Sequence, residues 1–142
     1  MFAEIALQTI LALIVGAIWL TPLVVSPAAR SSLDEEALKF FLKTFFIRFH
    51  LFIVTMLFAY LSIVYFFQLS EYELIWSSTK NLVMLILLGA NAVNLLLSLI
   101  INNTKIDTAS SFFRVMHGLS VAIFASTSFV SLYYLIEKFI LV

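Results

Sequence analysis

Four stretches of this chain carry almost no charged residue, and each is about long enough to cross a lipid bilayer as a helix. They are Ile5–Val25, Leu51–Phe67, Leu82–Ile101 and Val115–Ile136, in a sequence of 142 residues. About 20 apolar residues, each rising about 1.5 Å, span a hydrocarbon core about 30 Å thick. Because lipid offers the backbone no hydrogen-bond partners, each stretch must be helical. We therefore expect an all-α membrane protein.

Residues on either side extend these stretches into four predicted helices, which form one transmembrane bundle. The predicted helices cover 5–25, 33–67, 80–101 and 111–137 of a single domain, 1–142. Pro22 and Pro27 predict a kink and then the end of the first helix, because proline has no backbone N–H. The run Phe46–His50 is similar to the run Phe112–His117. This similarity raises the alternative of two duplicated helical hairpins.

Composition excludes several classes of protein. An apolar fraction of 63% with only 11% charged residues does not suit the surface of a soluble domain. The sequence has no cysteine, which excludes disulfides, thiolate catalysis and cysteine-ligated metals. Its net charge of zero argues against a nucleic-acid partner. No aspartate, glutamate, lysine or arginine lies near the centre of any of the four apolar stretches, which argues against an ion-coupled pump.

The basic residues predict the orientation of the bundle. Of the 8 lysines and arginines, six flank the first and third connections between helices: Arg30, Lys39, Lys43, Arg48, Lys105 and Arg114. Positively charged connections stay on the cytoplasmic side of a membrane. We therefore predict both termini on the outer, periplasmic side of a bacterial inner membrane.

The first connection carries a helix-start signal. Ser32-Leu33-Asp34-Glu35 has the pattern of a capping box, in which Ser32 and Glu35 satisfy each other's backbone N–H groups. Glu35 and Lys39 are four residues apart, as in a favourable helical ion pair. The second helix is therefore predicted to start near Leu33. The segment Leu33–Lys43 either lies on the membrane surface or continues directly into the membrane.

Small and polar residues predict how the helices pack. Glycine, alanine and serine four residues apart allow close contact between helix backbones, as at Gly16 after Ala12 and at Gly118, Ala122 and Ser126. Asn91, Asn94 and Ser98 share one face of the third helix, and Ser120, Thr127 and Ser131 form a looser stripe on the fourth. Lipid cannot satisfy buried amides, so these faces should point inward. They would either join helices by hydrogen bonds or line a path for a small neutral solute.

The two histidines suggest a low-spin haem site as an alternative. His50 and His117 open helices that run in the same direction, so both should lie at a similar depth near the cytoplasmic boundary. Two inward-facing imidazoles could ligate haem b, and Arg48 and Arg114 could hold its propionates. The blander interpretation is a pair of boundary histidines bonded to headgroups or carbonyls. We expect no cofactor, and two histidines are too few for another metal ion.

Residues 112–120, Phe112-Phe113-Arg114-Val115-Met116-His117-Gly118-Leu119-Ser120, resemble the signature that opens the last helix of the transmembrane protein 205-like family. The resemblance implies a small four-helix membrane protein of uncharacterised function. A fainter likeness, through Trp76, Lys80, Phe112 and Arg114, is to the haem-associated four-helix protoporphyrinogen oxidases. That family carries histidines in its first and third helices, whereas this chain has Asn91 in the third, which argues against oxidase activity.

These observations predict a non-catalytic membrane protein that acts by helix packing. It would work as a homo-oligomer or as an accessory subunit of a larger membrane complex. A haem-binding protein and a carrier of small neutral solutes are the alternatives. The lipid bilayer and other membrane subunits are the expected partners.

Overall fold

The computed structural model describes residues 2–67, 78–103 and 111–140, and its regular elements are all helical. Helix α1 (Phe2–Leu20) continues through a π-helical turn, η1 (Thr21–Val25), into α2 (Ser26–Ser32). Three longer helices follow: α3 (Glu35–Phe67), α4 (Thr79–Asn103) and α5 (Ser111–Ile140). In the described part of the chain, 4 helical spans are long and apolar enough to cross a membrane: 2–32, 35–67, 79–101 and 111–137. The chain is an all-α, four-helix integral membrane protein.

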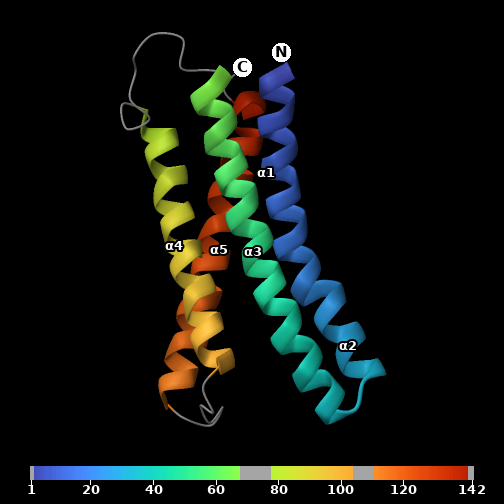
Figure 1. Ribbon diagram of the computed structural model, residues 1–142. Helices are drawn as coiled ribbons and strands as arrows, with labels where there is room; N and C mark the ends of the chain where they lie inside the picture. Colours follow the sequence, from blue (N-terminus) through green and yellow to red (C-terminus); the bar gives the residue numbers. More distant parts are fainter. Residues whose placement is uncertain (1, 68–77, 104–110, 141–142) are drawn as a thin grey trace.

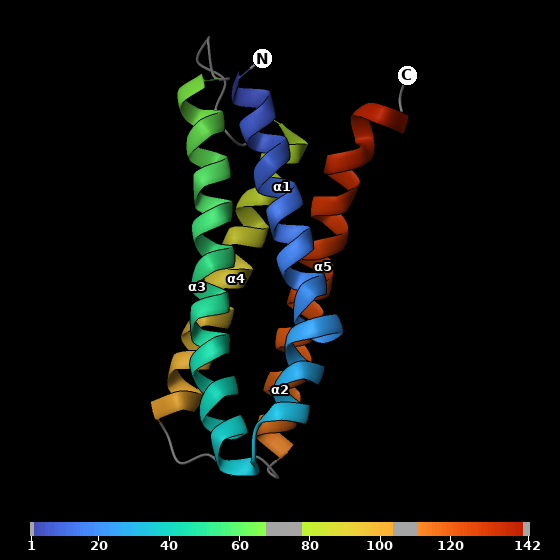
Figure 2. The same ribbon diagram turned by 90° about the vertical axis from the view of Figure 1, so that its right-hand side faces the viewer.

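The four spans run up and down, so that both chain termini lie at the same end of the bundle (Figure 1). We call this the termini end; it also holds the end of α3 and the start of α4. The opposite end, which we call the turn end, holds the connection from α2 to α3, the end of α4 and the start of α5 (Figures 1 and 2). Helix α3 packs most extensively on α4, and α1 on α5.

The first span differs from the prediction, because neither proline ends it. Pro22 has no N–H to donate to the carbonyl four residues back, and the chain adopts the wider π-helical turn there. Ser26 N–H then bonds the carbonyl of Thr21, five residues back. Pro27 falls in the first turn of α2, where a missing N–H costs little. The helical path therefore continues to Ser32 instead of ending at Val25.

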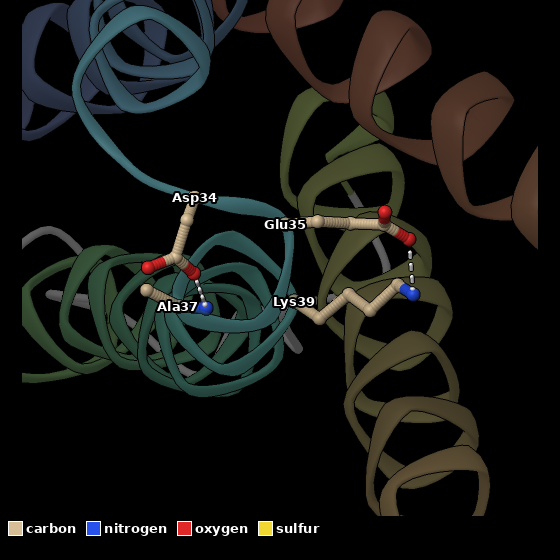
Figure 3. Close-up of polar contacts among 4 residues, drawn as sticks. All are labelled: Asp34, Glu35, Ala37 and Lys39. Carbon is tan, nitrogen blue, oxygen red and sulfur yellow. Dashed lines mark hydrogen bonds and ion pairs between the residues drawn. The ribbon is translucent and has the colours of Figure 1, made fainter.

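The start of α3 is also capped by a different residue from the one predicted. Asp34, not Ser32, is the cap: its Oδ1 accepts a hydrogen bond of 2.8 Å from the backbone N–H of Ala37 (Figure 3). Ser32 cannot fill this role because it still belongs to α2. The predicted pair of Glu35 and Lys39 is present, with 2.6 Å between Oε1 and Nζ.

Helix α3 then runs without a break to Phe67, so the segment Leu33–Lys43 is not a separate surface helix: from Glu35 it belongs to α3. At about 1.5 Å per residue, its 33 residues exceed the thickness of the hydrocarbon core by about 20 Å. Helix α4 begins one residue before its predicted start, and both α4 and α5 end two or three residues later than predicted.

The apolar core lies in the half of the bundle nearest the termini. Leu11, Ile14, Ile53, Leu57 and Met84 are almost fully enclosed there. Within α3, no residue before Phe49 is buried, and within α5 no residue before Thr127 is buried. The same boundary holds in α4, where no described residue after Asn94 is buried. The turn end of the bundle is therefore more open than the termini end.

Candidate functional site

A band of polar side chains lies inside the bundle, between the apolar core and the turn end. Asn91 and Asn94 of α4 are 0% and 1% exposed, and Ser98 of α4 is half-buried one turn further along. Helix α5 contributes Thr127, Ser128 and Ser131, which are buried, and Ser120, which is half-buried. The predicted inward orientation of the amide face is therefore present, and we call these residues, together with His50, the polar band.

The best-formed contact in the polar band joins α4 to α5 at mid-depth. Asn91 Nδ2 donates one hydrogen bond of 2.8 Å to Thr127 Oγ1 and a second of 2.9 Å to the carbonyl of Leu87. The Thr127 hydroxyl donates in turn to the carbonyl of Ile123, at 2.8 Å. Both amide protons of Asn91 and the hydroxyl proton of Thr127 are thus used, which fixes the relative positions of the two helices at this level.

His50 brings the third helix of the site, α3, into the polar band. It is 2% exposed, and its Nδ1 donates to the carbonyl of Phe46 one turn earlier. A neutral imidazole that donates from Nδ1 has an acceptor lone pair at Nε2. The hydroxyls of Ser98 and Ser120 each lie 3.4 Å from this Nε2 atom, one on α4 and one on α5. Asn94 Nδ2 also reaches the carbonyl of Ser120, at 3.4 Å.

Several polar atoms in this interior have no hydrogen-bond partner. They are Asn91 Oδ1, Ser128 Oγ and Ser131 Oγ, together with Gln8 Oε1 on α1. An unpaired buried polar atom costs free energy unless water or another ligand satisfies it. The polar band can therefore accept and donate further hydrogen bonds, and its members are neutral amides, hydroxyls and one imidazole. It has hydrogen-bonding capacity without a fixed charge.

The small residues predicted to bring helices of one chain together lie elsewhere. Gly16, Gly118, Ala122 and Ser126 are all exposed. An added Cβ on Gly16 or Gly118 would meet nothing within 4 Å. Helix α5 turns Phe124, Thr127 and Ser131 toward its neighbours instead, so the stripe of small residues is on its outer side. Spacing alone could not distinguish the two faces, because both are apolar in a membrane helix.

The two histidines have different surroundings in the structure. His117 is exposed and stacks on Phe113 of its own helix, with 6.0 Å between ring centroids. His50 directs Nε2 at two serines, and the Phe124 ring lies 4.7 Å from its imidazole. The ring of His50 therefore lies among the side chains of Ser98, Ser120 and Phe124. Arg48 and Arg114 are exposed, and Arg114 contacts Ser111 of its own helix.

The structure also joins polar residues that the sequence analysis did not connect. Lys80 of α4 lies 3.4 Å from Glu137 of α5 and 4.7 Å from the centroid of the Tyr134 ring. This cross-link lies at the termini end and is about one-quarter exposed on both sides. Among the described residues, no group of three or more histidine, aspartate or glutamate side chains is placed to hold a metal ion. Helical spacing could have shown that Lys80, Asn91 and Asn94 lie along one side of α4.

Comparison of the chain with protein-family models, with curated proteins and with solved structures finds no match.

Proposed function

We propose that this protein is a non-catalytic membrane subunit that associates inside the bilayer through the outer face of α5. Its partner is either a second copy of the chain or a larger membrane complex. The observation that carries the proposal is the exposed stripe of Gly118, Ala122 and Ser126, three small residues at four-residue spacing. Lipid-embedded helices associate where small residues let two backbones approach closely.

The surroundings of this stripe support its use between chains. Helix α5 has no buried residue from Ser111 to Ser126, and its contacts with α3 and α4 in this half are made by Ser120 and Phe124, on the side away from the small residues. In Figure 1, α2 lies beside the lower half of α3 and away from α5. In the described part of the chain, an added Cβ on Gly118 would meet nothing within 4 Å. A partner helix can reach the backbone of α5 there.

Substitution of Gly118 by leucine tests this function. We expect the Gly118→Leu variant to keep the stability of the isolated chain, because nothing in the chain packs on Gly118. It should lose the larger assembly when membranes are solubilised directly into native nanodiscs and particle mass is measured. Gly89→Leu is the matched control, since Gly89 is equally open but has Leu85 and Val93 four residues away. Unchanged particle mass in Gly118→Leu would contradict the proposal.

The proposal includes an orientation and a location. The basic side chains of Arg30, Lys39, Lys43, Arg48 and Arg114 lie at or near the turn end, while Lys105 is outside the described residues. The excess of positive charge supports a cytoplasmic turn end and a periplasmic termini end in a bacterial inner membrane. The resemblance to the transmembrane protein 205-like family stays a prediction. The fainter likeness to the four-helix protoporphyrinogen oxidases also stays a prediction, and its Trp76 is outside the described residues.

No cofactor is part of the proposed function. The arrangement of His50 supports a structural imidazole, because its ring nitrogens face Phe46, Ser98 and Ser120. An absorption spectrum of protein purified from haem-replete cells tests this point. We expect no Soret band. A band that His50→Ala removes would overturn this part of the proposal and favour the haem-binding alternative.

A path for small neutral solutes is the second candidate function, favoured by the unpaired polar atoms of the polar band. If the band only joins helices, Asn91→Leu should lower stability by about 0.6–2 kcal/mol, the range for hydrogen bonds between membrane helices. If it lines a path, proteoliposomes should show flux of a neutral solute such as glycerol, and Asn94→Leu should abolish it. Absence of flux through the unmodified protein would eliminate this candidate.

A further inference from the structure

A shallow groove runs along the outer side of α3, just before its first buried residue. Its volume is about 360 Å³, and it is lined by Phe40, Lys43, Thr44, Ile47 and Arg48. The last four of these residues lie three, four, seven and eight positions after Phe40, so all five form one stripe on the helix surface. The stripe combines two cations, a hydroxyl and two apolar side chains.

The level of this groove along the bundle follows from the contact between His50 and Ser98. Because their side chains lie 3.4 Å apart, residue 50 of α3 and residue 98 of α4 are near the same level. Helix α4 ends at Asn103, five residues beyond Ser98 and about 7.5 Å further along. Arg48 and Lys43 are two and seven residues from His50 in the same direction. They therefore bracket the level at which α4 ends, and we take this level as the membrane boundary.

The two cations of the groove differ from their neighbour Lys39. Lys39 is held by Glu35 at 2.6 Å, so its charge is already paired (Figure 3). Lys43 and Arg48 are exposed, and among the described residues neither forms a salt bridge within 4.0 Å. No acidic side chain lines the groove. Two unpaired positive charges at the membrane boundary are complementary to a phosphate group.

The apolar part of the groove fits the remainder of a lipid. Phe40 is 73% exposed and Ile47 is half-buried, so both present apolar surface beside the two cations. The aliphatic parts of lysine and arginine can lie along such a surface while their charges reach the headgroup level. Lysine and arginine residues at the cytoplasmic surface of a membrane attract anionic headgroups.

We propose that the Phe40–Arg48 groove is a binding site for an anionic phospholipid of the cytoplasmic leaflet. Lys43 and Arg48 contact the headgroup phosphate, and the hydroxyl of Thr44 donates a further hydrogen bond to it. An acyl chain lies over Ile47 in the direction of the membrane. This site is separate from the outer face of α5 and does not depend on association through that face, but its assignment to the cytoplasmic leaflet rests on the proposed orientation.

The site can be tested by native mass spectrometry of the purified, delipidated full chain. The probes are phosphatidylglycerol, phosphatidylcholine and inorganic phosphate. We expect a phosphatidylglycerol adduct and at least fivefold less phosphatidylcholine. Lys43→Gln and Arg48→Gln should each weaken phosphatidylglycerol binding about fivefold, since each basic residue near an anionic surface contributes a comparable amount. Lys39→Gln is the matched control and should leave binding unchanged. Lys43→Arg should retain binding.

Four outcomes would overturn the proposal. Equal binding of phosphatidylcholine would mean that only the apolar surface acts. Competition by inorganic phosphate at similar concentration would indicate a free-anion site. An equal effect of Lys39→Gln would indicate general attraction to positive charge. Unchanged phosphatidylglycerol binding in Lys43→Gln and Arg48→Gln would place any bound lipid elsewhere. Both side chains are exposed, so these variants should remain folded, which a thermal unfolding curve of each variant checks.

Discussion

The termini end and the turn end of this bundle differ in how their helices hold together. Toward the termini, Ile53 and Leu57 of α3 pack with Leu11 and Ile14 of α1 and with Met84 of α4, in a core that is almost fully enclosed. Toward the turns, the contact between helices depends on longer polar interactions around His50, and the first half of α5 has no buried residue. The half near the termini is held together by close packing. The half near the turns has exposed surface and polar atoms that are not used in contacts within the chain.

The path of the first span helps to explain this difference. Helix α1 covers α5 in the upper half of Figure 1, and the π-helical turn at Thr21–Val25 then leads into α2 beside α3. Phe124 of α5 fills part of the space between α3 and α5, with its ring 5.2 Å from that of Phe49. Below this level, Gly118 and Ala122 of α5 are exposed in the described part of the chain. In a membrane, that surface must contact lipid or another protein.

The largest expected difference between the two ends is their accessibility from opposite sides of the membrane. The sequence contains no cysteine, so single cysteines can be introduced without background. We expect Thr79→Cys at the termini end to react with an impermeant maleimide in intact cells. Ser32→Cys at the turn end should react only after permeabilisation. The reverse pattern would show that the basic residues do not set the orientation.

The two halves can also be compared by the free energy of unfolding that is lost when a leucine in each half is truncated to alanine. Leu57→Ala removes a side chain that is 0% exposed from the core, whereas Leu96→Ala removes one that is 58% exposed. Because lipid is as apolar as the core of the bundle, truncation of a buried leucine removes packing contacts but little hydrophobic free energy. We therefore expect Leu57→Ala to cost about 2 kcal/mol, the lower limit for such substitutions in water. Leu96→Ala should cost much less. Equal losses in reversible unfolding from detergent would contradict the described core.

The smallest predicted effect concerns the start of α3 at the turn end. Asp34→Ala removes the acceptor for the N–H of Ala37, and loss of a cap of this kind costs about 1 kcal/mol. Ser32→Ala should have no comparable effect, because the Ser32 hydroxyl does not cap α3. Amide hydrogen exchange at Ala37 measures the difference directly. Faster exchange in Ser32→Ala than in Asp34→Ala would restore the capping box that the sequence suggests.

The fold could be predicted from the sequence because hydrogen bonding in lipid leaves few alternatives. The four helices and the inward orientation of Asn91 and Asn94 follow from apolar length and from the cost of unpaired amides. The outward orientation of Gly118 does not, because small residues are compatible with lipid, with another helix and with a second chain. The separate environments of His50 and His117 also depend on how far the helices separate at the turn end.

The position of the first helix end was not predictable from the prolines alone. Proline removes one backbone donor, and the usual expectation is a break. Here the π-helical hydrogen bond from Ser26 to Thr21 carries the helix past Pro22, and Pro27 then falls where its missing donor is tolerated. This extension also explains why Asp34 caps α3. Ser32 is still part of α2, so it cannot cap the helix that follows.

The central claim is that the exposed small-residue face of α5 contacts another protein inside the membrane. The most direct test is a photo-crosslinking amino acid placed at Ala122 and, as a control, at the lipid-facing Val93 of α4, which is 52% exposed. After illumination of cells that express the protein at its native level, we predict a discrete crosslinked product from the Ala122 position and none from Val93. No protein product from Ala122, or equal products from both positions, would contradict the claim and leave α5 facing lipid.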